Sequence, residues 1–176
     1  MWGHGLPDKG NFLGLLFNES SQSLVAAFQQ EQSNGKWSED LYYRHKSVTE
    51  YLKIPSPCEA IHYSYVISAA GAPKIFFNVT RWDERGGDWE SLSSFNLETA
   101  ELCAEVGQHS LREPESKRAW VSSLISVNHD ATNIVCTIGF EQDIGAGNST
   151  VHYWLCDLRL ADFTVTKISL LQNTFL

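Results

Sequence analysis

Three stretches of this 176-residue chain follow one pattern, and this internal repeat is the strongest constraint on the fold. They span residues 11–29, 62–80 and 121–139, and they align without gaps at offsets of 51 and 59 residues. Each stretch is an apolar run, a polar turn and a second apolar run. Repetition at a period of this size predicts structural units that bury their apolar faces against one another.

The second apolar run of each stretch stays apolar at every other position. The positions concerned are Leu24, Ala26 and Phe28, then Ile75, Phe77 and Val79, then Ile134, Cys136 and Ile138. A period of two predicts strands, because a helix brings apolar residues back every three or four positions. The intervening positions are partly apolar as well, which is typical of sheets covered on both faces.

A second pair of strand patterns follows each stretch. These pairs span residues 40–45 and 48–54, 89–97 and 100–106, and 151–158 and 163–170. The segment from Glu98 to Leu111 is also rich in helix formers, but the register of the repeat favours a strand in its first half. The sequence therefore predicts an all-β chain of three four-stranded antiparallel units, at 11–54, 60–106 and 119–170.

Four-stranded antiparallel units repeated at this period are typical of β-propeller blades. Residues 126–136 (SVNHDATNIVC) resemble the turn and second strand of TolB-type, WD40-like propeller repeats. Residues 153–158 and 165–168 resemble the third and fourth strands of those repeats. The turn departs from the family at Asn128-His129, where Ser-Pro is usual, and at Ala131, where Gly is usual. The resemblance implies a propeller fold and specifies no activity.

Three blades cannot close a propeller, since closure takes about four to eight. An isolated arc of three would leave an apolar face bare on its first and last blades. We expect a two-fold homodimer, in which the first blade of each chain packs on the third blade of the other to give six. The alternatives are a fragment of a longer chain, a partner subunit that supplies the missing blades, or an all-β fold that is not a propeller.

The net charge and the cysteines limit which partners the protein could bind and in which cellular compartment we expect it. The formal net charge of −8 argues against binding to nucleic acid or to an anionic membrane. Cys103, Cys136 and Cys156 fall in apolar strand patterns, where a thiol acts as a small core residue. The cysteines have no metal-ligand spacing, and the chain start lacks the pattern of a secretory signal. We expect a cytoplasmic protein without metal or cofactor.

Propeller connectivity places the three loops between second and third strands on one rim; the first two hold tryptophans, and all three hold acids. The candidate ligand-binding residues there are Trp37, Trp82, Trp89, Asp83 and Asp88. Indoles beside carboxylates hold sugar rings or cationic groups by stacking and directed hydrogen bonds. The alternative is that these tryptophans pack between blades while the acids keep the surface soluble.

Three further positions stand where the first strand of each unit begins, at the expected channel mouth: Asn11, His62 and, in the third unit, Trp120 or Val121. Propeller enzymes that resemble this fold, such as sugar lyases and lactonases, often build metal or acid–base sites there. Such a metal site needs several converging ligands, and His62 is alone in this chain. No arrangement of nucleophile and base has supporting context, so we infer no nucleophilic catalysis.

Three functions remain open on the sequence. The first is a non-catalytic binding or assembly module that recognises a protein or glycan on the loop-bearing rim of an oligomeric propeller. The second is an enzyme, a sugar lyase or hydrolase, with its site around His62. The third is a structural subunit completed by another chain.

Overall fold

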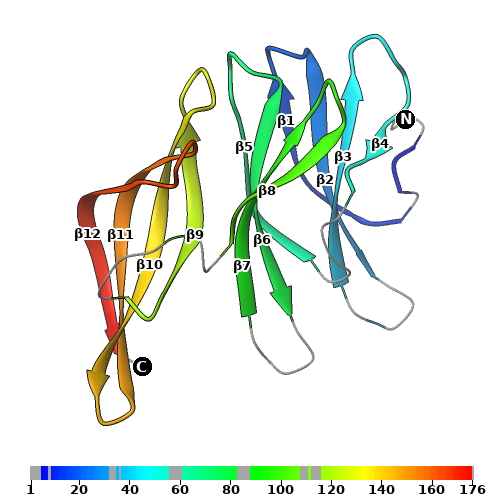
Figure 1. The fold of residues 1–176 in the computed structure, drawn as a ribbon. Coiled ribbons are helices and arrows are strands. Elements are labelled where there is room, and N and C mark those ends of the chain that lie inside the picture. Colours follow the sequence, from blue (N-terminus) through cyan, green and yellow to red (C-terminus); the bar gives the residue numbers. More distant parts are fainter. Residues whose placement is uncertain are drawn as a thin grey trace.

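A computed structural model describes residues 5–7, 9–31, 35, 37–55, 61–82, 88–107, 111 and 116–175 (Figure 1). Throughout these residues the regular structure is β, in three four-stranded sheets whose neighbouring strands are all antiparallel. The described segments contain no helix long and apolar enough to cross a membrane. The all-β architecture of three four-stranded units is therefore confirmed.

Within each sheet the strands follow one another in chain order. The first sheet holds β1 (Asn11–Asn18), β2 (Ser23–Glu31), β3 (Trp37–His45) and β4 (Leu52–Lys53). The second holds β5 (Ile61–Ser68), β6 (Lys74–Trp82), β7 (Asp88–Asn96) and β8 (Glu101–Gly107). The third holds β9 (Arg118–Val127), β10 (Asn133–Gly145), β11 (Asn148–Arg159) and β12 (Val165–Phe175). Residues 101–107 form a strand, so the repeat register outweighed the helix propensity of this segment.

Two details differ from the sequence prediction. The strand expected over residues 48–54 is reduced to Leu52–Lys53, because the Val48 amide donates to the His45 carbonyl in a turn and pairing with β3 resumes only at Leu52. Cys103 was expected in a core but is exposed on β8, an edge strand. Cys136 and Cys156 are buried directly opposite each other, as expected.

The turn between β9 and β10 holds an alanine in a left-handed conformation. Ala131 has a φ of 58°, a left-handed conformation that costs any residue but Gly. Asn128 Oδ1 accepts hydrogen bonds from the amides of Thr132 and Asn133 at 2.9 and 2.8 Å. These bonds hold the turn although Ala131 occupies a left-handed position that favours glycine.

The three sheets lie side by side with two apolar cores between them (Figure 1). The core between the first and second sheets includes Leu41, Tyr43, Phe77 and Phe95, and the Tyr43 and Phe95 rings meet edge to face at 5.1 Å. The core between the second and third sheets includes twelve buried residues, among them Phe76 and Leu124. Such burial on both faces of the second sheet is what the apolar residues at the intervening positions of its strands predict.

Polar contacts also join successive sheets. Asn18 is fully buried, and its Nδ2 donates to the Ser68 hydroxyl and to the Ala69 and Ala72 carbonyls in the β5–β6 turn, at 2.8 to 3.0 Å. The Gly71 amide of that turn donates to the His129 carbonyl of the β9–β10 turn at 2.9 Å. Since β5 contacts both β1 and β9, the first strands line one edge of the stack. This arrangement is compatible with propeller blades around a channel.

Candidate functional site: the rim and two uncovered sheet faces

One end of the stack gathers the rim residues predicted from the sequence. The β2–β3, β6–β7 and β10–β11 hairpins lie at this end, together with the starts of β1, β5 and β9 (Figure 1). In the ladders Trp37 is opposite Glu31 and Trp82 is opposite Asp88. The backbone positions of the candidates on described strands therefore share one rim.

The side chains of these candidates are described unequally. Trp37 is 48% exposed and Asn11 is exposed. Asp83 lies outside the described residues. For four candidates only the backbone is described, and these are His62, Trp82, Asp88 and Trp89.

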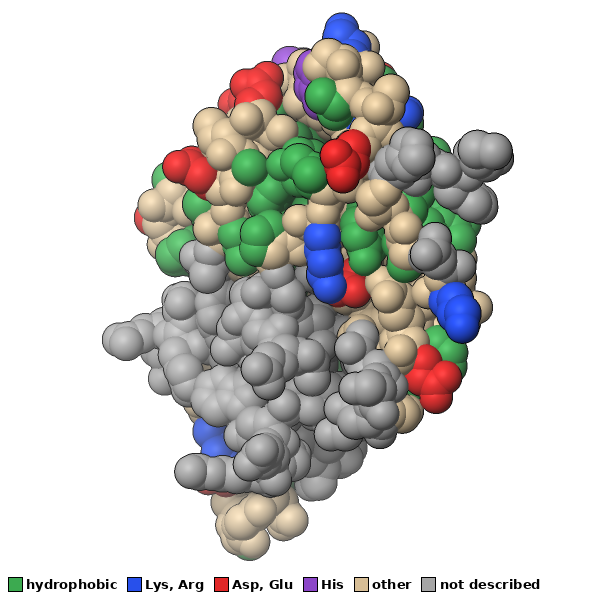
Figure 2. Space-filling view, turned by 90° about the vertical axis from the view of Figure 1, so that its right-hand side faces the viewer, with side chains coloured by type: hydrophobic (Ala, Val, Ile, Leu, Met, Phe, Trp, Pro, Cys, Tyr) green, Lys and Arg blue, Asp and Glu red, His purple; other side chains and the backbone are tan. Residues whose placement is uncertain are grey.

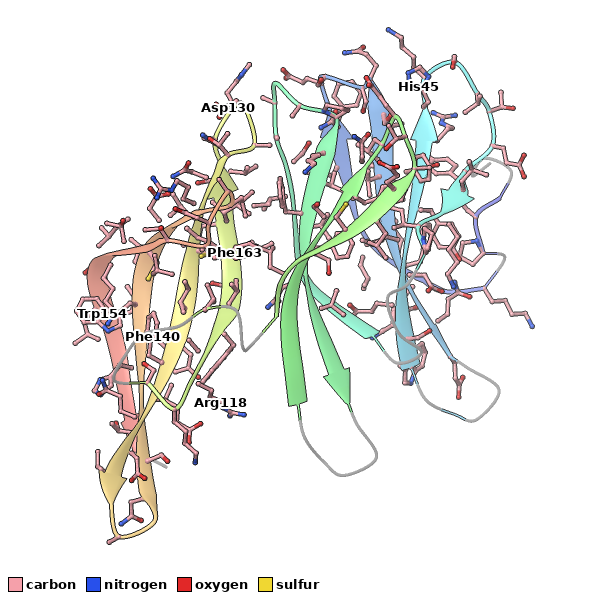
Figure 3. All side chains as sticks on the ribbon, viewed as in Figure 1. His45, Arg118, Asp130, Phe140, Trp154 and Phe163 are labelled. Carbon is pink, nitrogen blue, oxygen red and sulfur yellow. The ribbon has the colours of Figure 1, made fainter. Side chains whose placement is uncertain are left out.

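Trp120 lies against its own sheet. It pairs with Gly139, and a Cβ on that glycine would stand 2.7 Å from the indole, so the ring needs the glycine beneath it. Tyr153 meets the indole edge to face at 6.1 Å, and the Arg118 guanidinium lies 4.9 Å from its centre (Figure 3). With 9% of Trp120 exposed, its role in the single chain is packing.

Glu141, an acidic residue near this indole, forms ion pairs with two basic side chains. Its carboxylate contacts Arg118 Nε at 2.8 Å and Lys117 Nζ at 3.3 Å. Burial alone would raise the pKa of Glu141, but hydrogen bonds from Ser149 and Lys117 and the Arg118 charge outweigh it and lower the pKa. Glu141 is therefore an ionised structural anchor and is poorly suited to donate a proton.

The described residues form no group of three or more His, Cys, Asp or Glu side chains that could hold a metal ion. An apolar hollow of about 200 Å³ lies between the first two sheets, next to Gly14 and Val66. Small-molecule sites usually enclose about 300–1,000 Å³, so this hollow is small for a ligand pocket.

The first sheet leaves only the β1 side of its outward face uncovered by the described chain. Leu6 and Tyr51 pack against Ala26, Phe28 and Tyr42 on β2 and β3, which are buried, whereas Phe12, Leu15 and Phe17 on β1 are exposed. This outward face carries Phe12, Leu15, Phe17, Ala26, Phe28, Tyr42 and Arg44, which the ladder registers place on the side away from the second sheet. Leu15 is 57% exposed and Phe17 is 49% exposed. Figure 2, viewed from the side where the first sheet lies in Figure 1, shows hydrophobic side chains gathered at the surface. Apolar exposure of this kind marks an interaction surface.

The third sheet also has an uncovered outward face, of different chemistry. It carries Trp120, Ser126, Val135, Thr137, Gly139, Tyr153 and Asp157. Val135 and Thr137 are half-buried, while Ile168 and Leu171 on edge strand β12 are more than half exposed. This face is more polar than that of the first sheet.

The sequence reasoning missed Arg44 and Asp157, two of the charged residues on these faces. Arg44, Phe95 and Leu158 occupy equivalent positions on the third strands of the three sheets. They pair with the equivalent second-strand residues Leu24, Ile75 and Ile134, respectively. An alignment of the third strands would have shown a charge at a position that is apolar in the other two sheets. That signal was available in the sequence.

Comparison with models of known protein families gives no match, and neither does comparison with curated proteins. The function is therefore inferred from this geometry.

Proposed function

We propose that the chain is a non-catalytic assembly module: two copies join their uncovered faces, the first sheet of each on the third sheet of the other, to close a six-bladed ring. The observation that carries the proposal is the apolar outward face of the first sheet, with Leu15 57% exposed. Six is also the only multiple of three within the range of about four to eight blades at which propellers close.

The turns support a second copy as the occupant. Asn18 and Asn128 begin equivalent turns, and each carboxamide oxygen accepts amide hydrogens of its own turn. The Asn18 amide group reaches the turn of the next sheet, whereas the Asn128 amide group bonds the exposed Thr132 hydroxyl. A second copy would place its Asn18–Ser23 turn beside Asn128, as the β5–β6 turn lies beside Asn18.

The solution mass tests this function. We expect a light-scattering mass of about twice 19.8 kDa for the wild type and a shift toward 19.8 kDa for Leu15→Asp, because a carboxylate would be buried in each closing interface. Val48→Asp is the matched control, since Val48 is exposed to a similar degree but lies in the β3–β4 turn. A wild type that stays monomeric at all concentrations, or a Leu15→Asp variant that stays dimeric, would refute the proposal.

We assign recognition of a protein or glycan to the rim of this ring, on the support of the exposed Trp37 at the start of β3. Stacking on an indole requires its face to be accessible. On a glycan array and in pull-downs, Trp37→Ala should lose binding that Val48→Ala retains. Equal binding by both variants would remove Trp37 from the site.

A further inference from the structure

Arg44 has an incomplete set of contacts in the single chain. It lies on β3 opposite Leu24, and its guanidinium carbon lies 5.1 Å from the centre of the Tyr51 ring. Its Nε is buried and has no hydrogen-bond partner. Arg44 forms no ion pair with any described residue. A buried donor without an acceptor is costly, so this side chain is placed for a partner that the single chain does not supply.

Asp157 occupies the other uncovered face. It lies on β11 opposite Val135, and Asn133 Nδ2 donates to its carboxylate, at 3.0 and 3.2 Å from the two oxygens. No described cation lies within ion-pair distance of it. The amide group of Asn133 fixes the direction of the carboxylate without neutralising its charge.

The repeat shows how these two positions meet when sheets stack. Tyr43 is opposite Val25 in the first sheet, and Asp157 is opposite Val135, the counterpart of Val25, in the third. Phe95 is opposite Ile75 in the second sheet, and Arg44 is opposite Leu24, the counterpart of Ile75, in the first. Tyr43 and Asp157 are thus equivalent, as are Phe95 and Arg44.

The equivalent residues are in contact where the first and second sheets stack. The Tyr43 and Phe95 rings lie 5.1 Å apart across that interface. If the third sheet of one copy stacks on the first sheet of another in the same way, Asp157 takes the place of Tyr43 and Arg44 takes the place of Phe95. An aromatic pair is replaced by opposite charges.

We propose that Arg44 of each copy forms an ion pair with Asp157 of the second copy, once in each of the two interfaces that close the ring. This inference rests on the proposed function and identifies a contact by which one copy of the chain recognises the other. The pair supplies the acceptor that the Arg44 guanidinium lacks. It also favours first-on-third stacking, because that arrangement brings opposite charges to the positions that meet in the stack.

Two charge reversals test the pair. Arg44→Asp gives a chain with aspartate at both positions, and Asp157→Arg gives a chain with arginine at both. Each variant alone brings like charges together twice, and we expect dimerisation to weaken by on the order of a hundredfold or more. Mixed together, the two variants have opposite charges in both interfaces, so native mass spectrometry should show a heterodimer of one chain of each.

Lys46→Asp and Glu98→Arg are the matched controls, because they make the same charge changes at exposed positions in turns. They should leave the dimer unchanged. Recovery in the mixture also shows that both variants fold.

The outcomes separate the two proposals. A dimeric wild type with monomeric single variants and a heterodimer in the mixture supports the ion pair. If the wild type is dimeric and the single variants dimerise equally well, or if mixing restores nothing, the ion pair is refuted and the ring stands. A monomeric wild type refutes the ring and the ion pair together.

Discussion

Leu15 and Leu124 occupy the same place in two sheets and have opposite surroundings. Each lies on the first strand of its sheet, opposite a residue in the middle of the second strand, Ala26 or Cys136. Leu124 is 5% exposed because the second sheet packs against it, whereas Leu15 is 57% exposed because no described segment covers it. The residue and its register are alike, so burial here is decided by what stacks on the sheet.

The comparison also concerns the kind of face that each sheet presents. The covered face of the third sheet is a continuous apolar core, while its outward face mixes Val135 with Thr137, Ser126 and Asp157. The outward face of the first sheet is more apolar and carries Arg44 on β3, opposite Leu24. The two outward faces have different chemistry, as the two sides of a specific interface often do. This favours stacking of a first sheet on a third sheet over stacking of two identical sheets.

The largest expected effect comes from truncating the two leucines. Leu124→Ala should lower the free energy of unfolding by about 2–5 kcal/mol, because it leaves a cavity between packed sheets. Leu15→Ala should cost much less in dilute solution, since Leu15 is already in water. Chemical unfolding monitored by tryptophan fluorescence measures both.

Protein concentration sharpens this test. If a second copy covers Leu15, the cost of Leu15→Ala should grow as concentration rises, while that of Leu124→Ala should stay nearly constant. Equal costs for the two variants in dilute solution would show that the face of the first sheet is covered within one chain.

A smaller effect is expected at the two equivalent asparagines. Asn18→Ala removes a buried carboxamide that joins two sheets and leaves carbonyls of the β5–β6 turn without a donor, which should cost about 1–3 kcal/mol. Asn128→Ala should cost less, because water can replace its exposed contacts. Thermal unfolding of the two variants in dilute solution compares them directly. A cost at Asn128 equal to that at Asn18 would contradict the difference in burial.

The smallest expected effect is a difference in reactivity between a buried thiol, Cys136, and an exposed one, Cys103. Burial between sheets, helped by the nearby Cys156 and Asp157, raises the pKa of Cys136 from 9.0 to about 12. We therefore expect Cys136 to resist alkylation in the native protein at a pH where the exposed Cys103 reacts, as measured by peptide mass mapping.

The same shift predicts a pH dependence of stability. The folded protein holds the Cys136 proton more tightly than the unfolded chain does, so the stability from this group is complete below about pH 9 and is lost as pH rises toward about 12. Unfolding free energies measured across that range should fall less steeply in Cys136→Ala than in Cys103→Ala. Parallel slopes would exclude Cys136 as the cause.

Much of the fold could be read from the residues because strands have a two-residue period that shows in the chain. The alternation at Ile75, Phe77 and Val79 predicted a strand, and the repeat register predicted the strand at residues 101–107 against its helix propensity. The short β4 and the exposed Cys103 were missed, because each depends on where a sheet ends. Less of the candidate site could be predicted from the sequence. Trp37 and Asn11 were placed on the rim, but the packing of Trp120 could not be foreseen, because it depends on Gly139 and Tyr153 from other strands.

The sequence by itself determined the period, the strand pairs and their grouping into three sheets, because hydrogen-bonded neighbours in these sheets are also neighbours along the chain. Only the tertiary structure decided which face of each sheet is covered, that Asn18 reaches the turn of the next sheet, and that Arg44 and Asp157 stand at opposite ends of one arc. These features depend on how whole sheets stack, and stacking joins residues that are far apart in the chain and leaves no periodic trace in it.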